Sequence, residues 1–280
     1  IPENRRNFSI QAFTKYPLSR VDDLAGDNTN IESERLEKDK SLLKKTKKIA
    51  KYQDFRPERD LASKGPRFFL LGDSMLSSQL YVSLKKSLKE LNPEATVDFE
   101  GHTGTGLAKP KYFDWQTKAL EWKQSRRYAV TMIFLGTNDS QDFVYKKRIY
   151  RFGTESWDQI YTERVRNLVS EICQFSEKVL WFGQLPMREP DFEQKMLHLN
   201  AILAKALDEQ SCAQFLVLRS WVSDENDKFV VAKAIEEHGK MIRIRAPDGI
   251  HLTPKGASFF AQKLIARFRD DWQNLILEEN

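Results

Sequence analysis

Cysteine and histidine are scarce in this sequence of 280 residues, which contains two cysteines and four histidines. Two cysteines cannot form a disulfide-stapled scaffold, and no spacing of cysteine and histidine fits a zinc site. Long apolar runs are lacking too, because no stretch approaches the roughly 20 residues that a helix needs to cross a bilayer. With 40% hydrophobic and 30% charged residues, the composition is that of a globular chain. Collagen, coiled coils, integral membrane proteins and zinc fingers are excluded.

The charge of the chain is positive but unevenly distributed. The net charge is +5 and the pI is about 9.0, a balance that suits nucleic acid, an acidic polymer or a membrane surface. Residues 1–64 hold 15 basic and 11 acidic side chains, whereas residues 65–280 hold 30 and 29. The larger segment is nearly neutral, and it has no basic–aromatic RNA motif, helix-turn-helix signal or zinc site. We therefore expect no binding of nucleic acid.

Residues 1–64 are predicted to be a basic arm or linker that is partly helical. Helix formers dominate residues 31–50, and six lysines lie in a stretch without acids between Lys40 and Asp54. Such a cluster fits a tether near an anionic surface, and it fits a solvated helix or linker as well. Because the chain begins with Ile1, we expect that a signal peptide or membrane anchor preceded it.

From residue 65 onward, short apolar runs alternate with amphipathic stretches. The runs lie at 67–71, 96–99, 129–135, 178–182 and 214–218, and the helical patterns lie at 76–91, 115–124, 157–175, 192–209 and 254–268. The runs do not alternate between apolar and polar residues, which suits strands buried on both faces. We predict a three-layer, doubly wound α/β domain over residues 65–280, flavodoxin-like, with about five parallel strands and helices on both faces. Ligands of such sheets bind beyond the carboxyl ends of the strands.

Two of these strand ends carry a serine and a glycine-rich segment. The first run is followed by a Gly-Asp-Ser sequence that ends at Ser74, directly before a helical pattern. The positive end of a helix suits a nucleophile whose acyl intermediate carries an oxyanion, although Asp and Ser are also common helix caps. The second run leads into segment 101–107, where Gly104 or Gly106 could bring a backbone N–H close to a ligand. This segment fits neither a phosphate-binding loop nor a dinucleotide fingerprint.

Two later strand ends carry an asparagine and an aspartate–histidine pair. The third run is followed by Gly-Thr-Asn-Asp, in which Asn138 is either a neutral N–H donor or a turn residue. Asp248 and His251 lie three residues apart just before the last helical pattern. A catalytic serine needs a base, and the base needs a carboxylate to hold its tautomer, so a single turn can supply both. His251 is the one histidine with a nearby aspartate at a strand end.

The order serine, glycine, asparagine and aspartate–histidine resembles the SGNH hydrolases, also called the GDSL lipase/esterase superfamily, over about residues 66–270. The four matching positions are Ser74, Gly106 with Gly104 as the alternative, Asn138, and Asp248 with His251. Met75 departs from the commonest residue after the serine. Further features resemble a largely uncharacterised bacterial cell-envelope branch of the superfamily; these are Tyr112-Phe113-Asp114-Trp115, Gln141, Leu185-Pro186-Met187-Arg188 and Arg243-Ile244-Arg245.

The resemblance implies a serine esterase that needs no metal or organic cofactor. Ser74 would be the nucleophile, His251 the base and Asp248 its partner, and the oxyanion would be bound by the N–H groups of Ser74 and Gly106 and by the Asn138 amide. The implied substrate is a small acyl ester, acetyl foremost, on a cell-envelope glycan in the periplasm. The arm would then tether the enzyme to a membrane or to an envelope protein. An O-acetyltransferase, a thioesterase or lysophospholipase, and an inert glycan-binding or scaffold protein remain open.

Several further side chains are candidates for substrate contact. The candidates are Asp73, Gly104, Trp115, Gln141, Arg188 and Arg245. Arg188 is the first choice for binding a substrate anion, followed by Arg243 and Arg245, although surface salt bridges explain these arginines equally well. The aromatic residues Tyr112, Trp115, Trp157 and Tyr161 could stack on sugar rings or pack in the core.

The two cysteines are expected to serve packing rather than catalysis. Cys173 lies in a helical pattern and Cys212 precedes a strand, and neither has a strand-end histidine beside it. A disulfide between them remains open.

Overall fold

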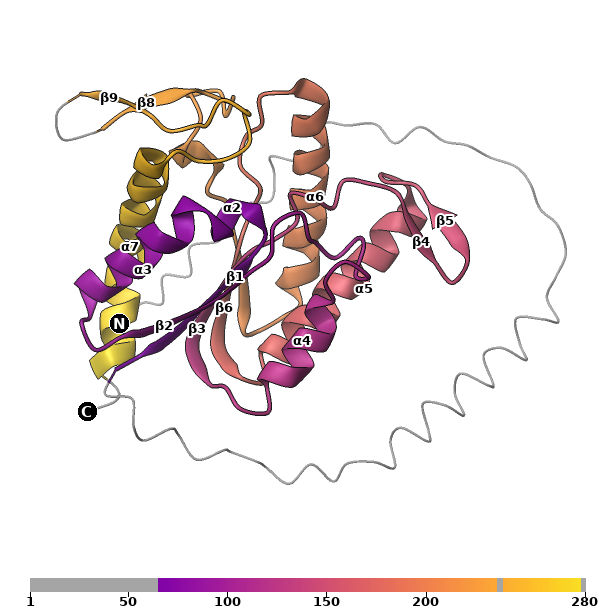
Figure 1. The fold of residues 1–280 in the computed structure, drawn as a ribbon, viewed down its shortest axis with the longest axis horizontal. Coiled ribbons are helices and arrows are strands. Elements are labelled where there is room, and N and C mark those ends of the chain that lie inside the picture. Colours follow the sequence, from indigo (N-terminus) through magenta and orange to yellow (C-terminus); the bar gives the residue numbers. More distant parts are fainter. Residues whose placement is uncertain (1–64, 236–238, 278–280) are drawn as a thin grey trace, which may run out of the picture. The chain divides into compact units, whose positions relative to one another are not determined.

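In a computed structural model, which describes residues 65–235 and 239–277, β-strands and helices alternate along the chain (Figure 1). The central strands are β1 (Arg67–Gly72), β2 (Thr96–Gly101), β3 (Tyr128–Phe134), β6 (Ser176–Phe182) and β7 (Ala213–Leu216). The helices are α2 (Ser74–Ser77), α3 (Gln79–Leu91), α4 (Trp115–Trp122), α5 (Glu155–Ile172), α6 (Pro190–Asp208) and α7 (Pro254–Leu277), with a 3₁₀ turn η1 (Arg219–Trp221). The predicted arm, residues 1–64, lies outside the described residues.

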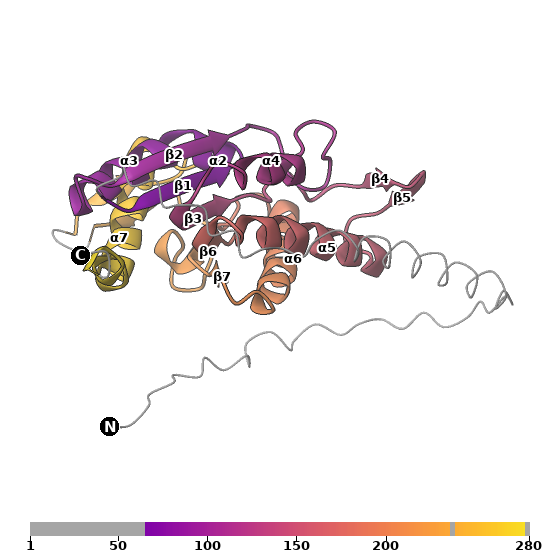
Figure 2. The ribbon, with the colours of Figure 1, turned by 90° about the horizontal axis from the view of Figure 1, so that it is seen from below.

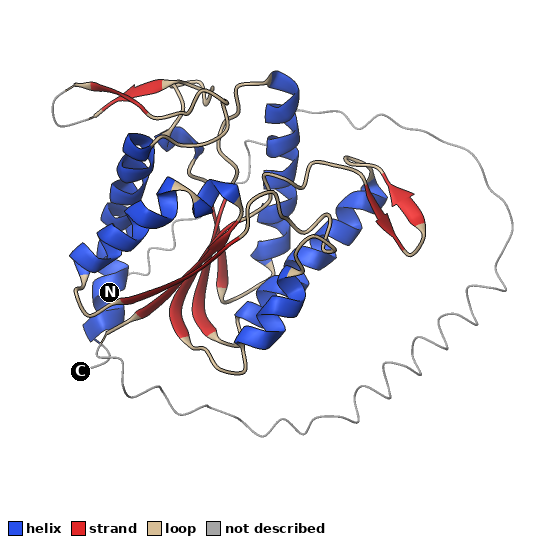
Figure 3. Cartoon of the chain, in the orientation of Figure 1, coloured by secondary structure: helices blue, strands red, loops and turns tan. Residues whose placement is uncertain are grey.

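The five central strands form one parallel sheet in the order β2-β1-β3-β6-β7. Neighbouring residues of one strand point to opposite faces, as Phe68 and Phe69 of β1 do. Helices α3 and α7 pack with Phe68 on one face, and α4, α5 and α6 pack with Phe69 on the other (Figure 3). The predicted three-layer, doubly wound fold is therefore confirmed.

The structure differs from the predicted elements at two places. One continuous helix was expected over 76–91, but the chain breaks at Ser78 into α2 and α3. The side chain of Asp73 caps α2, whereas α3 takes its direction from Leu80, Leu84 and Leu88, which are buried against the sheet. Two antiparallel hairpins were also missed, because strands of three residues leave no apolar run. They are β4 (Phe143–Tyr145) with β5 (Arg148–Tyr150), and β8 (Ala232–Ala234) with β9 (Met241–Arg243).

The two cysteines form a disulfide. Cys173 follows the end of α5 and Cys212 precedes β7, with their Cα atoms 6.0 Å apart. The bond closes a loop that contains β6 and α6, and so ties two layers of the domain together. In the part of the chain that the structure describes, no helix has the length and apolar composition that crossing a membrane requires.

Candidate active site

The carboxyl ends of three adjacent strands bring together the segments that the sequence analysis singled out. Gly72, the last residue of β1, lies opposite Gly101 on β2 and Phe134 on β3. Beyond these residues, the N–H of Asp73 donates to the Phe134 carbonyl at 3.1 Å, and the N–H of His102 donates to the Gly72 carbonyl at 3.1 Å. The serine, glycine and asparagine segments therefore begin side by side.

Asp73 fixes the start of the helix that carries Ser74. Its Oδ1 accepts a hydrogen bond from the N–H of Met75 at 2.9 Å, and its Oδ2 accepts one from the N–H of Gly136 at 3.3 Å. The side chain is fully buried. Burial, opposed by the hydrogen bond from Met75 and reinforced by the nearby Asp139, raises the pKa of Asp73 to about 7. The prediction that Asp73 contacts substrate is wrong, because its carboxyl links the ends of β1 and β3 inside the protein.

Ser74, His251 and Asp248 form a continuous chain of hydrogen bonds. Nε2 of His251 lies 2.9 Å from Oγ of Ser74, and Nδ1 of His251 lies 2.7 Å from Oδ2 of Asp248. Partial burial tends to raise the pKa of Asp248, but hydrogen bonds from the His251 ring and from the N–H groups of Ile250 and His251 outweigh it and hold the pKa at about 2. An ionised Asp248 therefore fixes the His251 tautomer whose Nε2 can accept a proton from Ser74.

Arg245 supports the loop that carries Asp248 and His251. Its Nη2 donates to the carbonyls of Ile250 at 2.7 Å and Gly249 at 3.5 Å, and the side chain is fully buried. Burial lowers the pKa of Arg245 to about 10. The prediction that Arg245 contacts substrate is wrong. The side chain is buried and donates its hydrogen bonds to carbonyls of its own loop.

Arg188 lies against the same loop from outside. Gly249 has a φ of +78°, and a Cβ there would lie 2.5 Å from Cβ of Arg188, so only glycine fits. Nη1 of Arg188 donates to the Pro247 carbonyl at 2.6 Å, and its guanidinium lies 5.3 Å from the Phe229 ring centroid. Arg188 is exposed beside the catalytic candidates, so its contact with a substrate anion stays a prediction. Arg243 is exposed as well, with its Nε 3.3 Å from the Arg245 carbonyl oxygen.

The segments that follow β1, β2 and β3 also carry backbone and side-chain N–H groups that could bind an oxyanion. Nδ2 of Asn138 donates one hydrogen bond to the Thr105 carbonyl at 2.9 Å, which leaves its second N–H available. The N–H groups of Ser74 and Gly106 have no hydrogen-bond partner among the described residues. Gly104 is exposed, with nothing within 4 Å of an added Cβ. The structure therefore favours Gly106 over Gly104 as the donor beside Asn138, and a substrate contact of Gly104 stays a prediction.

Asp139, a buried carboxylate for which the sequence alone indicates no role, holds the glycine segment. Asp139 accepts hydrogen bonds from the N–H groups of Ala108 at 2.7 Å and Leu107 at 3.0 Å, and from the hydroxyl of Tyr161 at 2.8 Å. Burial, opposed by these hydrogen bonds, raises the pKa of Asp139 to about 6. A Cβ on Gly106 would lie 2.1 Å from its Oδ1, so the segment can approach Asp139 only with glycine at this position.

Helix α5 also supports the glycine segment, through Arg164, which no local sequence signal indicated. Nη1 of Arg164 donates to the carbonyls of Leu107 at 2.7 Å and Ala108 at 2.8 Å, the same two residues whose N–H groups donate to Asp139. Trp157 and Tyr161 stack on each other in the core, with centroids 4.7 Å apart. Of the two expectations for these aromatic residues, stacking on a sugar ring or packing in the core, packing in the core is therefore correct for both.

Trp115 and Gln141 both contact other residues of the protein. Trp115 is buried at the start of α4, with its ring 4.6 Å from that of Phe113, so the proposed stacking on a sugar is wrong and the core alternative is correct. Tyr112 is 67% exposed and so does not pack in the core, and its stacking on a sugar ring stays a prediction. Nε2 of Gln141 donates to the Asn138 carbonyl at 2.5 Å, which positions Asn138, and a contact of Gln141 with substrate stays a prediction.

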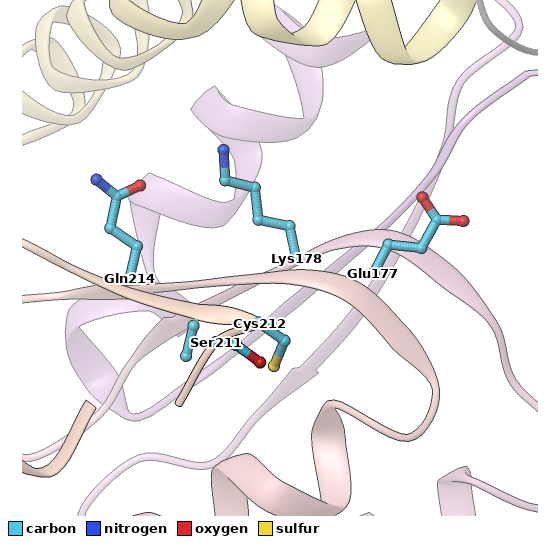
Figure 4. A pocket seen from close by; sticks show the side chains of 6 residues that line it. Glu177, Lys178, Ser211, Cys212 and Gln214 are labelled. Atoms are coloured by element: carbon cyan, nitrogen blue, oxygen red, sulfur yellow. The ribbon is translucent and has the colours of Figure 1, made fainter. Parts of the chain in front are cut away.

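A surface hollow elsewhere on the domain shows no comparable chemistry. It lies at the amino-terminal ends of β6 and β7, opposite the strand ends that carry Ser74, and is lined by Glu177, Lys178, Ser211, Cys212, Ala213 and Gln214 (Figure 4). None of these lining residues is a histidine, so Ser211 has no imidazole base within the hollow. Among residues 65–235 and 239–277, no group of three His, Cys, Asp or Glu side chains is arranged to hold a metal ion.

Solved structures share this fold at low sequence identity. A catalytic mutant of Axe2, an acetylxylan esterase from Geobacillus stearothermophilus, matches with a TM-score of 0.51 and 16% identity, over 72% of this chain and 93% of its own. LAE5, an α/β hydrolase enzyme from the metagenome of Lake Arreo, Spain, matches with a TM-score of 0.52 and 14% identity, over 72% and 94%. No curated protein sequence matches the chain.

These matches agree with the doubly wound α/β fold that the sequence predicts. One protein family covers residues 67–267, which run from the start of β1 into α7 and include every residue of the site described above. The chain therefore belongs to the family described as "Protein of unknown function (DUF459)".

Proposed function

We propose that this protein is a serine esterase that removes acetyl groups from a polysaccharide. The observation that carries the proposal is the hydrogen-bonded chain from Ser74 through His251 to Asp248. Nucleophile, base and orienting carboxylate lie within hydrogen-bonding distance in the order that acyl transfer requires. Three N–H groups that have no hydrogen-bond partner among the described residues, one each on Ser74, Gly106 and Asn138, can bind a developing oxyanion.

The mechanism follows from these positions. Oγ of Ser74 attacks the ester carbonyl while Nε2 of His251 takes its proton, and the carbonyl oxygen becomes an oxyanion bound by the three N–H groups. The C–O bond to the sugar then breaks, and the imidazolium returns its proton to the departing hydroxyl. Water, deprotonated by His251, then attacks the acyl-serine. The bond from the acyl carbon to Oγ of Ser74 breaks, the imidazolium returns its proton to Oγ, and acetate leaves. Asp248, ionised at any pH well above about 2, stabilises the imidazolium in both steps.

Acetyl and polysaccharide are proposed on the basis of the structural neighbours. Axe2 is an acetylxylan esterase, and its catalytic mutants replace a serine, an aspartate and a histidine, the last two lying three positions apart in that chain. Asp248 and His251 have the same spacing here. Hydrolysis is proposed ahead of transfer to a sugar because Axe2 is an esterase. The side chains of His251 and Asp248 are 30% and 45% exposed, so water can reach the base.

A cell-envelope location, with the periplasm as the compartment, belongs to the same proposal. The Cys173–Cys212 disulfide supports it, because disulfides persist in oxidising compartments. The substrate would then be an acetylated envelope glycan, and residues 1–64 would tether the domain to a membrane or an envelope protein.

The test compares acetate release by wild type, Ser74→Ala and Ser78→Ala. Ser78 is an exposed serine four residues further on, whose side chain makes no capping hydrogen bond, so it is the matched control. With an aryl acetate and with acetylated xylan and acetylated peptidoglycan, wild type and Ser78→Ala should release acetate equally and Ser74→Ala should not. Equal rates for Ser74→Ala and wild type would overturn the proposal. Transfer of acetyl to an added deacetylated oligosaccharide would assign a transferase instead.

A further inference from the structure

The hairpin of β4 and β5 has one face packed on the domain and one face in solvent. Phe143 pairs with Tyr150, and the buried Phe143 ring lies 4.2 Å from the Arg164 guanidinium. Val144 pairs with Ile149 on the opposite face, and each is 69% exposed. Figures 1 and 2 show the hairpin projecting beyond the sheet and its helices. An aliphatic pair is therefore presented on a projecting ribbon whose other face is already occupied.

The turn of the hairpin places positive charge beside this aliphatic pair. Lys146 and Lys147 have φ values of 47° and 64°, the left-handed region that two-residue hairpin turns require at both positions. Asn-Gly suits such a turn, whereas lysine is strained in it, so the fold accepts strain to keep two cations at the tip. Arg148 follows directly, and all three side chains are exposed. Within the described residues, no acid forms an ion pair with any of the three.

From this geometry we infer that the β4–β5 hairpin docks on an anionic lipid bilayer. Aliphatic side chains are stabilised in an apolar medium, and adjacent lysines and arginines are attracted to anionic headgroups. An anionic bilayer offers both features in one surface. A polyanionic chain in water would leave Val144 and Ile149 exposed. A ribbon of three residues per strand is also too small for the roughly 800 Å² per partner of a stable protein interface, whereas a bilayer needs no shape complementarity.

Docking there would bring the candidate active site close to the bilayer. β4 begins five residues after Asn138, at the carboxyl-terminal edge of the sheet. Arg164 contacts both the Phe143 ring of the hairpin and the carbonyls of the glycine segment. The inference rests on the hairpin alone and does not depend on esterase activity.

A single fluorophore on the full chain tests the contact directly. Because the two native cysteines form a disulfide, Ile149→Cys provides the one free thiol for an environment-sensitive label among the described residues. Val82→Cys on α3, where valine is 57% exposed, is the matched control. Vesicles of phosphatidylglycerol in phosphatidylcholine should shift the emission of the label at 149 to the blue, and pure phosphatidylcholine should not. The label at 82 should respond to neither.

Charge variants separate the hairpin from the basic residues 1–64. Neutralising Lys146, Lys147 and Arg148 to Gln should lower the vesicle partition coefficient by about 10²-fold, at about fivefold per cation. The same change at the exposed Lys85, Lys86 and Lys89 of α3 removes equal charge and should have a much smaller effect. The variant Val144→Ser with Ile149→Ser keeps every cation and should lower partitioning by about 10²-fold, at about 1.5 kcal/mol per aliphatic side chain.

Three results would overturn the inference. The first is an unshifted label at 149 in the presence of anionic vesicles. The second is equal partitioning of the two charge variants, which would assign binding to the chain's total charge. The third is an equal blue shift with soluble polyglutamate, which would make the hairpin a polyanion site instead of a bilayer contact.

Discussion

Replacing Asp139 by Asn should impair the oxyanion site without touching any reacting atom. The carboxylate accepts three hydrogen bonds, from the N–H groups of Leu107 and Ala108 and from the Tyr161 hydroxyl. An amide has one acceptor oxygen, and its N–H₂ group would face donors. The Tyr161 hydroxyl can rotate to accept, but a backbone N–H cannot, so one buried donor is left unsatisfied at a cost of about 1–3 kcal/mol. The unfolding free energy should fall by that amount.

Asp139→Asn should also lower kcat, in addition to lowering the unfolding free energy. The two N–H groups anchor the segment that carries Gly106, so kcat should fall by about 10²-fold, as it does when an oxyanion donor is misplaced. Tyr161→Phe removes one hydrogen bond and leaves both backbone donors paired, so it should cost about 1 kcal/mol and much less rate. Asp208→Asn, the same change at an exposed site on α6, should alter neither. Steady-state kinetics and urea denaturation measure both effects, and a wild-type kcat in Asp139→Asn would refute the reasoning.

Three further predictions concern stability and the loop of the base. Burial raises the pKa of Asp73 to about 7 and that of Asp139 to about 6, so the folded chain holds these protons more tightly than the unfolded chain. These two groups should make the unfolding free energy decrease by a few kcal/mol between about pH 4 and pH 8. Asp73→Asn should make this dependence of the unfolding free energy on pH less steep. Arg245→Met removes a buried charge together with its hydrogen bonds to the loop that carries His251. The kcat should fall by about 10²-fold, because the base is no longer positioned, while urea denaturation should show a change in unfolding free energy within about 2 kcal/mol. A wild-type kcat would contradict the role of Arg245 in positioning this loop. Reduction of the disulfide between Cys173 and Cys212, which lie 39 residues apart, should lower the unfolding free energy by about 4 kcal/mol, and an unchanged melting temperature in dithiothreitol would contradict this.

The sheet could be predicted from sequence because burial on both faces leaves continuous apolar runs. The five central strands lie within two residues of the expected positions, and the order of serine, glycine, asparagine and aspartate–histidine segments follows from their places at strand ends. The β4–β5 hairpin could not be predicted, because Val144 and Ile149 face solvent and give no buried pattern. The sequence of a short strand with one exposed face cannot be distinguished from that of a loop.

The supporting residues of the site were harder to predict than the reacting ones. Ser74 and His251 occur in local patterns that chemistry explains, whereas the role of Asp139, in the loop after β3, depends on Tyr161, which lies 22 residues away on α5. Arg245 is predicted to contact substrate or to form a surface salt bridge, since arginine is rarely buried, and nothing local shows that it contacts the carbonyls of its own loop. Burial and tertiary contact decide these roles, and a single sequence carries neither.

The most direct test of the central claim is to trap the acyl-enzyme. The chain is mixed with an aryl acetate, quenched in acid within the first turnover, and analysed by intact mass and peptide mapping. Our account expects one added acetyl group on the peptide that contains Ser74, and none in Ser74→Ala. Acetate release at the wild-type rate by Ser74→Ala, or an acetyl group found only on other residues, would contradict it.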